Sequence, residues 1–372
     1  MAFGDTIATI DLGRLEKNLH QVIKRVGQRN MIAVVKANAY GHGASEIAKR
    51  LIKSSRQVAM LGVATLDEGI ALRESGIKTP ILLMTGFSVS RIQELVAYRL
   101  TPALFDLNTL SLLSRTVQKT GCKIAAHIKV DTGMGRLGIA PSEVTTFLQK
   151  TADAKITVSG IFSHFAEADL SDLTYAREQL SKLKKIKTSL GKHPAVFHLA
   201  NSAAILHLPE ALLDSVRPGL MLYGYSPLQE KIKTGLSPIL TVKSRVISIK
   251  KVPIGTAISY GRTFVTKRET RVAVIGIGYA DGYPRALSNC GEMIANGVRV
   301  PVIGRVCMDM TMLDVTNAPS LLAGDFVTVI GQEGSACVFA NDLAKKANTI
   351  PYEILCGLKG NMKRVYLRKV SD

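Results

Sequence analysis

The sequence predicts an α/β protein in which a (β/α)8 barrel over residues 8–230 precedes a mainly β domain over residues 231–372, which also includes residues 1–7. Three observations predict this fold. A chain of 372 residues is too long for one ordinary core, so we expect two domains. The first part alternates short apolar runs with helical patterns, and near Leu236 the composition changes to Val, Ile, Thr and Gly.

The barrel prediction rests on eight apolar runs spread over about 220 residues. The runs are MIAVVK (31–36), AMLGVAT (59–65), PILLMTG (80–86), LTPALFD (100–106), CKIAAHIKV (122–130), ITVSGIFSHF (156–165), AVFHLAN (195–201) and SVRPGLMLYG (215–224). Each is nearly continuous in apolar residues, as buried parallel strands are. A doubly wound open sheet is the competing fold, and the lack of a GxGxxG pattern after the first run weakens it.

Helical patterns separate most of these runs. Apolar residues recur every three or four positions in residues 42–55, 90–99 and 107–121. Thr65 and Glu68 have the spacing of a capping box and predict a helix over residues 66–76. Residues 181–193 combine Leu and Ile at helical intervals with many lysines, which predicts an amphipathic helix with a solvated basic face.

The second part of the chain has the composition of strands. Val, Ile and Thr dominate residues 239–255, 270–282, 297–315 and 325–331. Turn signals at Asn296-Gly297 and Asp281-Gly282 fall between the predicted strands. Only residues 340–358 have a helical pattern. We therefore expect a mainly β domain with one helical region near its end.

Composition limits the classes of function. The formal charge is +19, from 48 Lys and Arg against 29 Asp and Glu, which is compatible with nucleic-acid binding. The basic residues are spread out, aromatic residues are 5% and Trp is absent, so we favour a basic solvated surface and expect no nucleic-acid partner. We also expect no membrane span. The five cysteines are scattered along the chain and no export signal is visible, and both features suggest a cytoplasmic protein. No His, Cys and carboxylate spacing suggests a metal site.

Chemistry-bearing residues follow several of the apolar runs. Lys36 ends the first run, so it would lie at the carboxyl end of a barrel strand, where barrel enzymes keep their active sites. Partial desolvation would lower the pKa of its amine and make it a nucleophile or a base. A lysine that ends a strand and reaches solvent is the alternative interpretation, and Lys36 alone would favour it.

Other runs end in residues that would share the same mouth of the barrel. Arg136, His164 and Arg217 would supply hydrogen-bond donors there, and the Asn201-Ser202 and Gly219 segments would offer backbone N–H groups to a phosphate. An amine, a set of cations and an anion-binding backbone suit an aldehyde cofactor with a phosphate, bound as a Schiff base.

These segments resemble the motifs of bacterial alanine racemases, which are fold-type III pyridoxal 5'-phosphate (PLP) enzymes. AVVKANAYGHG (33–43) is similar to the lysine motif of that family. Eight later segments resemble further family motifs in the same order: VDTGMGRLG (130–138), HFAEAD (164–169), HLANSAA (198–204), VRPGLMLYG (216–224), ISYGRTF (258–264), GIGYADGYPR (276–285), GRVCMDMTMLDV (304–315) and TIPYEILC (349–356). The resemblance begins at IDLGRLEKNL (10–19), ahead of the lysine motif. The resemblance thus covers nearly the whole chain.

The resemblance implies a complete active site. Cofactor contacts would come from Lys36, Tyr40, Arg136, His164, Asn201, Ser202, Arg217, Gly219, Leu220 and Tyr352. Lys36 would hold the cofactor and exchange the D-side proton, and Tyr260 would exchange the L-side proton. Arg136 and the backbone of Met308 would bind the substrate carboxylate. Tyr279 and Tyr352 would narrow the entrance, and Lys129 matches a position that can be carbamylated in relatives.

The implied reaction is the interconversion of L-alanine and D-alanine, which supplies D-alanine for peptidoglycan. Racemisation needs a proton removed from one face of the α-carbon and one returned to the other, which two bases achieve. Arg217 would face the pyridine nitrogen, where most such enzymes place an acid; because an arginine cannot accept the proton, the ring should be a weaker electron sink. In the family, Tyr260 and Met308 come from the partner chain, so we expect a homodimer with shared sites.

Four other functions stay open from the sequence. A broad-specificity amino-acid racemase would share all these motifs, although Tyr279 and Tyr352 favour a small substrate. Decarboxylases of the same fold lack this arrangement of tyrosine-bearing segments. A non-catalytic PLP-binding protein would keep Lys36 without needing Tyr260 or a second domain. A nucleic-acid binder would show a steep salt dependence of binding.

Overall fold

The computed structural model describes residues 6–228, 233–358 and 362–368. The chain divides into two compact units. The first unit comprises Met1–Arg14, Tyr40–Gly43 and Ser237–Asp372, and the second comprises Leu15–Ala39 and Ala44–Leu236. Residues 40–43 therefore belong with the C-terminal part of the chain although they lie only a few residues after the first barrel strand.

The second unit contains a closed parallel barrel, which confirms the predicted fold. Its strands, in the described part of the chain, pair in sequence order around the barrel and β9 closes onto β2. They are β2 (Asn30–Val34), β3 (Val58–Val63), β4 (Ile81–Leu83), β5 (Thr101–Leu104), β6 (Ala125–Lys129), β7 (Thr157–Phe162), β8 (Val196–His198) and β9 (Ser215–Val216).

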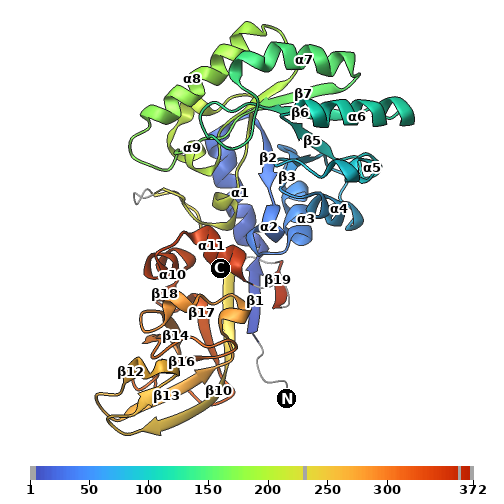
Figure 1. Cartoon of the computed structure of the whole chain (residues 1–372). Helices are drawn as coiled ribbons and strands as arrows, with labels where there is room; N and C mark the ends of the chain where they lie inside the picture. Colours follow the sequence, from blue (N-terminus) through green and yellow to red (C-terminus); the bar gives the residue numbers. More distant parts are fainter. Residues whose placement is uncertain (1–5, 229–232, 359–361, 369–372) are drawn as a thin grey trace. The chain divides into compact units, whose positions relative to one another are not determined.

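Helices surround the strands of the barrel in Figure 1. Their bounds are α1 (Leu12–Val26), α3 (Ala44–Ser54), α4 (Leu66–Glu74), α5 (Ile92–Ala97), α6 (Leu107–Thr120), α7 (Val144–Asp153), α8 (Thr174–Ser189) and α9 (Ser202–His207). The capping box predicted at Thr65 is present, because the Thr65 hydroxyl accepts from Glu68 N–H and the Glu68 carboxylate accepts from Thr65 N–H.

Helix α6 illustrates how local sequence sets these helices. Asp106 caps its start by accepting a hydrogen bond from the N–H of Thr109 at 2.7 Å. Leu110, Leu113 and Val117 recur at helical spacing and form the buried face. The helix ends at Gly121, whose φ of 68° lies in the left-handed region that favours glycine.

The predicted eighth strand is much shorter than its apolar run. Only Ser215–Val216 forms β9, and Leu220–Tyr223 forms a short 3-10 helix, η4. Pro218 lacks the N–H that a ladder needs, and Gly219 takes φ −128° and ψ −96°, so the chain leaves the sheet here. The prediction of a strand through residue 224 was therefore wrong after Val216.

The first unit is built on a sheet that, counted over the described residues, has nine strands. The strands are β1 (Thr6–Asp11), β10 (Leu240–Val252), β13 (Thr270–Ile275), β14 (Glu292–Ala295), β15 (Val298–Pro301), β16 (Thr311–Asp314), β17 (Phe326–Glu333), β18 (Ala336–Val338) and β19 (Lys363–Leu367). The long strand β10 pairs antiparallel with β1, β13 and β17. Its residues 240–246 alternate between buried and half-buried, as a strand with one core face does.

Three smaller elements complete this unit. Strands β11 (Ala257–Ile258) and β12 (Phe264–Val265) pair antiparallel as a two-stranded ribbon. The predicted Asn296-Gly297 turn connects β14 to β15, with φ values of 50° and 78° at its two residues. The predicted helical region forms two helices, α10 (Ala340–Ala347) and α11 (Pro351–Gly357), because Asn348 ends the first in the left-handed region and Pro351 begins the second.

Candidate active site

Lys36 begins a left-handed turn directly after strand β2. Ala37, Asn38 and Ala39 all have φ of 51–54° and ψ of 47–51°, and Tyr40 has φ of 53°. This conformation costs roughly 1–2 kcal/mol for each residue that is not glycine, so surrounding contacts must hold it.

Two side chains hold this turn. One oxygen of the Glu68 carboxylate accepts a hydrogen bond from the N–H of Ala37 at 2.6 Å, and the other accepts from the N–H of Ala64 at 2.7 Å. The amide oxygen of Asn38 accepts from the N–H of Ala44 at 2.9 Å. The backbone around Lys36 is therefore fixed by side chains from the turn itself and from the capping box of α4.

Arg217 lies directly after β9 with only 4% of its surface exposed. Its Nη1 donates to Nδ1 of His198 at 2.7 Å and to the His198 carbonyl at 3.0 Å. Its Nη2 donates to the carbonyls of Ser163 at 2.7 Å and Leu199 at 3.0 Å, and lies 3.3 Å from Nδ1 of His164. Among the described residues, no partner accepts from Nε–H and no carboxylate contacts the guanidinium. One directed donor therefore remains available for a ligand.

The mouth of the barrel carries excess positive charge. Burial, followed by the charges of Arg136, Arg217 and Lys36, lowers the pKa of the Lys129 amine to about 8, while the charge of Asp131 acts in the opposite direction. Burial, with Arg217 as the next cause, lowers the pKa of His164 to about 3. These mutual effects indicate that the four cations lie within electrostatic range of one another, so an anionic ligand would be stabilised here.

The loop after β6 holds Arg136, whose side chain is exposed. Asp131 organises this loop by accepting hydrogen bonds from the N–H groups of Gly133 at 2.8 Å, Met134 at 2.7 Å and Arg136 at 3.2 Å. Burial alone would raise the pKa of the Asp131 carboxyl, but these backbone donors outweigh it and the pKa lies below its usual value. The Asp131 carboxylate is thus hydrogen-bonded to backbone N–H groups of its own loop rather than paired with the neighbouring cations.

The predicted phosphate-binding segments lie at the start of α9 and in the chain after β9. The hydroxyl of Ser202 accepts from Gly219 N–H at 2.9 Å and from Met221 N–H at 3.4 Å. Asn201 caps α9 by accepting from the N–H of Ala204 at 3.1 Å. Leu220, which lies between the two donors, is buried. The predicted phosphate-binding residues of this unit are therefore close to one another.

The remaining predicted site residues lie in the first unit. Tyr40 and Tyr352 pack together with ring centroids 5.8 Å apart and an interplanar angle of 44°. Burial raises the pKa of the Tyr40 phenol far above its usual value, and Tyr352 beside it adds to the effect. Tyr40 is therefore a neutral hydrogen-bonding phenol rather than an anion.

Tyr260, Tyr279 and Met308 lie on three adjacent loops of the first unit. The N–H of Tyr279 donates to the Cys307 carbonyl at 3.0 Å, and the next N–H donates to the Met308 carbonyl at 2.9 Å. Ser259, beside Tyr260, donates its hydroxyl to the Arg305 carbonyl at 2.7 Å. The three apolar side chains are 72%, 41% and 54% exposed. Cys307, in the same loop as Met308, is half-buried.

Several residues near the site were not predicted from sequence. His127 and His198 point into the barrel interior with Arg217, Asp131 shapes the Arg136 loop, and Glu68 supports the Lys36 turn. In the sequence, only their positions distinguished them. The two histidines lie within apolar runs, Asp131 directly follows one, and Glu68 belongs to a capping box. The predicted residues Lys36, Lys129, Arg136, His164, Ser202 and Arg217 all follow barrel strands at their carboxyl ends.

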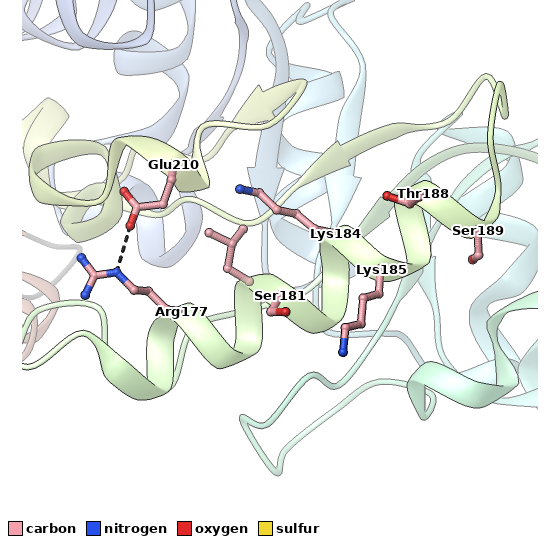
Figure 2. A pocket seen from close by; sticks show the side chains of 8 residues that line it. Arg177, Ser181, Lys184, Lys185, Thr188, Ser189 and Glu210 are labelled. Atoms are coloured by element: carbon pink, nitrogen blue, oxygen red, sulfur yellow. Dashed lines mark hydrogen bonds and ion pairs between the residues drawn. The ribbon is translucent and has the colours of Figure 1, made fainter.

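A separate hollow of about 550 Å³ lies along α8. Figure 2 shows Arg177 paired with Glu210 beside Lys184 and Lys185. None of the residues at the carboxyl ends of the barrel strands lines it. In the described parts of the chain, no cluster of His, Cys, Asp and Glu is suited to a metal ion, and no helix is long and apolar enough to span a membrane.

The fold and the mouth of the barrel together define a class: a (β/α)8-barrel enzyme with a lysine just after its first barrel strand and a cluster of cations at the mouth of the barrel. Sequence profiles identify the family. The N-terminal domain of alanine racemase matches residues 10–227, and the C-terminal domain of alanine racemase matches residues 239–366. The chain belongs to the alanine racemase family, whose members are isomerases.

Individual relatives agree with this assignment over their full length. An alanine racemase from Halothermothrix orenii is 42% identical over 98% of this chain and 98% of that protein. A solved alanine racemase from Clostridium difficile 630 has a TM-score of 0.91 at 34% identity, covering 97% of this chain and 95% of the other. The Bartonella henselae alanine racemase, solved with covalently bound pyridoxal phosphate, has a TM-score of 0.88 at 32% identity, covering 98% and 99%.

Proposed function

We propose that this protein is a PLP-dependent alanine racemase that interconverts L-alanine and D-alanine with two bases, Lys36 and Tyr260. The observation that carries the proposal is the state of Arg217. Both terminal nitrogens of its buried guanidinium are occupied by the protein, and Nε–H has no partner among the described residues. Such a donor fits the ring nitrogen of a pyridine.

The other residues of the barrel mouth also fit this cofactor. The Ser202 hydroxyl oxygen accepts from the N–H groups of Gly219 and Met221, so its own O–H would be the donor to a phosphate. Asn201 and Leu220 would frame that phosphate, and Tyr40 and Tyr352 would supply phenol donors to it. PLP, when bound, supplies a carbonyl that condenses with amines and a conjugated ring that withdraws electrons from the substrate α-carbon.

The residues of the chain then have separate tasks. Lys36 would hold the cofactor covalently and, once released by the substrate amine, move a proton at one face of the α-carbon. Tyr260 would move a proton at the opposite face. Arg136 and the backbone N–H of Met308 would hold the substrate carboxylate, and Tyr279 would restrict the entrance with Tyr352. Arg217 can donate to the ring nitrogen but cannot protonate an electron-rich ring as an acid would, which limits side reactions.

We also propose that the site is shared in a homodimer. Tyr260, Tyr279 and Met308 are exposed on adjacent loops of the first unit, which leaves them accessible to a partner chain. A two-fold dimer would complete two sites at once. Mixing Lys36→Ala and Tyr260→Phe chains tests this. Statistical re-association should restore about a quarter of wild-type activity, because half the dimers would carry one intact site; no recovery would exclude a shared site.

Lys129 is proposed to carry a carbamate. Its pKa of about 8 provides neutral amine near physiological pH, and a carbamate would place a negative charge near the cationic Arg136 and Arg217. The amine nitrogen would bond to the carbon of CO₂ with loss of one proton. A carbamate signal in ¹³C NMR with labelled CO₂, absent in Lys129→Ala, would establish it. An unmodified amine at saturating CO₂ would exclude it.

The direct test of the proposed function is racemisation of each alanine enantiomer by purified protein, with absorbance of the bound cofactor before and after borohydride. Lys36→Ala should lose both the cofactor bond and the activity. Rates with larger amino acids would separate an alanine racemase from a broad-specificity one. We further propose a cytoplasmic role in supplying D-alanine for peptidoglycan, supported by the bacterial relatives and tested by rescue of a D-alanine auxotroph.

A further inference from the structure

Two histidines that no role above uses lie beneath Arg217 in the barrel interior. His127 comes from β6 and is 2% exposed, and His198 comes from β8 and is fully buried. Nδ1 of His127 lies 2.9 Å from Nε2 of His198, and Nδ1 of His198 lies 2.7 Å from Nη1 of Arg217. The three side chains therefore form one continuous hydrogen-bonded chain that begins inside the barrel and ends at its mouth.

Packing fixes the orientation of both rings. Phe162 stacks on His198 with centroids 4.8 Å apart and an interplanar angle of 7°, and the Arg217 guanidinium lies 5.3 Å from the same Phe162 ring. Gly160 leaves room for His127, because a Cβ at that position would lie 2.6 Å from the His127 ring. Neither imidazole can turn without disturbing close-packed neighbours.

The direction of every hydrogen bond in this chain follows from Arg217. A guanidinium has no acceptor, so Nδ1 of His198 must be unprotonated. The proton of a neutral His198 ring then lies on Nε2, which faces His127 and donates to it. Nδ1 of His127 must in turn be unprotonated. A proton on Nδ1 of His198 would place two donors face to face at 2.7 Å, so Arg217 and the two tautomers define one another.

Both histidines are held neutral by their surroundings. Burial is the largest cause that lowers the pKa of His127, to about 4, and the charge of Arg217 adds to it. Burial, followed by the charges of Arg217 and His127, lowers the pKa of His198 well below its usual value. The chain can therefore accept hydrogen bonds from the guanidinium without adding a carboxylate or a second positive charge beneath it.

We propose that His198, backed by His127, is a positioning residue that holds the Arg217 guanidinium in the orientation in which Nε–H faces the cofactor ring nitrogen. This role rests on the proposed function, because the ring nitrogen belongs to PLP. His198 occupies Nη1 from below, while the Ser163 and Leu199 carbonyls occupy Nη2. His198 accepts as a neutral ring, so the Nε–H donor of Arg217 is oriented towards the ring nitrogen without a carboxylate beside the guanidinium.

The first experiment needs no activity. Histidine ¹⁵N NMR of the full-length wild-type protein should show His198 and His127 with bare Nδ1 and protonated Nε2, both unchanged between pH 6 and pH 8. Arg217→Met should allow His198 to change tautomer or exchange between tautomers. A protonated Nδ1 on His198 in the wild type, or titration of either ring in this range, would overturn the proposal even if the protein racemises alanine.

The second experiment uses the cofactor-loaded enzyme. His198→Leu removes the acceptor, and we expect kcat to fall about 10- to 100-fold, the effect of one lost hydrogen bond to a charged group, with KM for alanine changed less than about threefold. His198→Gln should recover most of this loss, because its carbonyl can accept from Arg217 while its amide donates to His127. Cofactor absorbance on each variant checks that loading is equal.

A double-mutant cycle separates positioning from a structural role. In an Arg217→Lys background, His198→Leu should lower kcat by less than about twofold, because the guanidinium that it orients is gone. Equal losses in both backgrounds would overturn the proposal. If the wild type failed to racemise alanine at all, the proposed function would fail, while the NMR experiment would still decide the hydrogen-bond chain.

Discussion

Glu68 links the capping box of α4 to the strained turn at Lys36, and replacing it with glutamine should destabilise the barrel and loosen that turn. One carboxylate oxygen accepts from Ala37 N–H at 2.6 Å; the other accepts from Ala64 at 2.7 Å and Thr65 at 3.1 Å. A glutamine amide has one oxygen, so it can accept either from Ala37 N–H or from the N–H groups of Ala64 and Thr65, but not from both. Its NH₂ group would then face a backbone N–H on the other side.

The size of the effect follows from these contacts. A hydrogen bond to a charged group contributes about 1.5–3 kcal/mol, and the neutral amide also weakens the bonds it keeps, so Glu68→Gln should cost about 2–3 kcal/mol. Thr65→Ala is the matched control. It removes only the bond from Glu68 N–H to the Thr65 hydroxyl, and it should cost about 1 kcal/mol.

Two measurements check this reasoning. Denaturant unfolding gives the free energies, and hydrogen exchange of the peptide over residues 36–44 reports the turn locally. Glu68→Gln should speed exchange in that peptide, whereas Thr65→Ala should leave it nearly unchanged. The reasoning is refuted if Thr65→Ala costs as much as Glu68→Gln, or if exchange in the peptide is the same in both variants.

Three further predictions concern the barrel. Since the folded pKa values of His127 and His198 lie below 6.5, the unfolded chain binds protons that the folded chain does not, so the free energy of unfolding should fall by about 1.4 kcal/mol per pH unit for each histidine as pH drops from 6.5 towards 4. His127→Gln should reduce that slope by one proton in pH-dependent unfolding. Gly160→Ala should cost about 1–3 kcal/mol through its clash with the His127 ring, and His127→Ala in the same chain should relieve the clash; additive losses in thermal melts would contradict this. Asp131→Asn should raise KM for alanine more than it lowers kcat, because it loosens the Arg136 loop, and an unchanged KM would exclude this positioning.

Apolar patterning and local signals in the sequence predicted much of the fold. The runs at residues 31–36, 122–130 and 156–165 became barrel strands because a strand buried on both faces must be apolar throughout. The box at Thr65 and the Asn296-Gly297 turn formed as predicted, since their geometry depends only on neighbouring residues. The strand predicted from the last run ends at Val216, because Pro218 and the unusual backbone conformation of Gly219 outweigh the apolar character of the residues that follow.

Chain order also predicted which residues share the barrel mouth. Parallel strands end on the same side, so residues that follow β2, β6, β7, β8 and β9 had to meet there. The functions of Lys36, Tyr260 and the other site residues remain predictions. The supporting residues His127 and Glu68 were missed, because nothing local distinguishes a histidine inside the barrel or an acid that bonds a distant backbone N–H.

The sequence by itself determined the order of elements, the side of the barrel that carries the polar residues and the family to which the chain belongs. Tertiary structure alone decided the left-handed turn after Lys36, the grouping of Tyr40–Gly43 with the C-terminal unit and the direction of the hydrogen bonds from Arg217 through His198 to His127. The physical reason is range. Periodicity and capping are set by residues a few positions apart, whereas a hydrogen-bond chain inside a barrel depends on side chains that closure brings together from strands far apart in sequence.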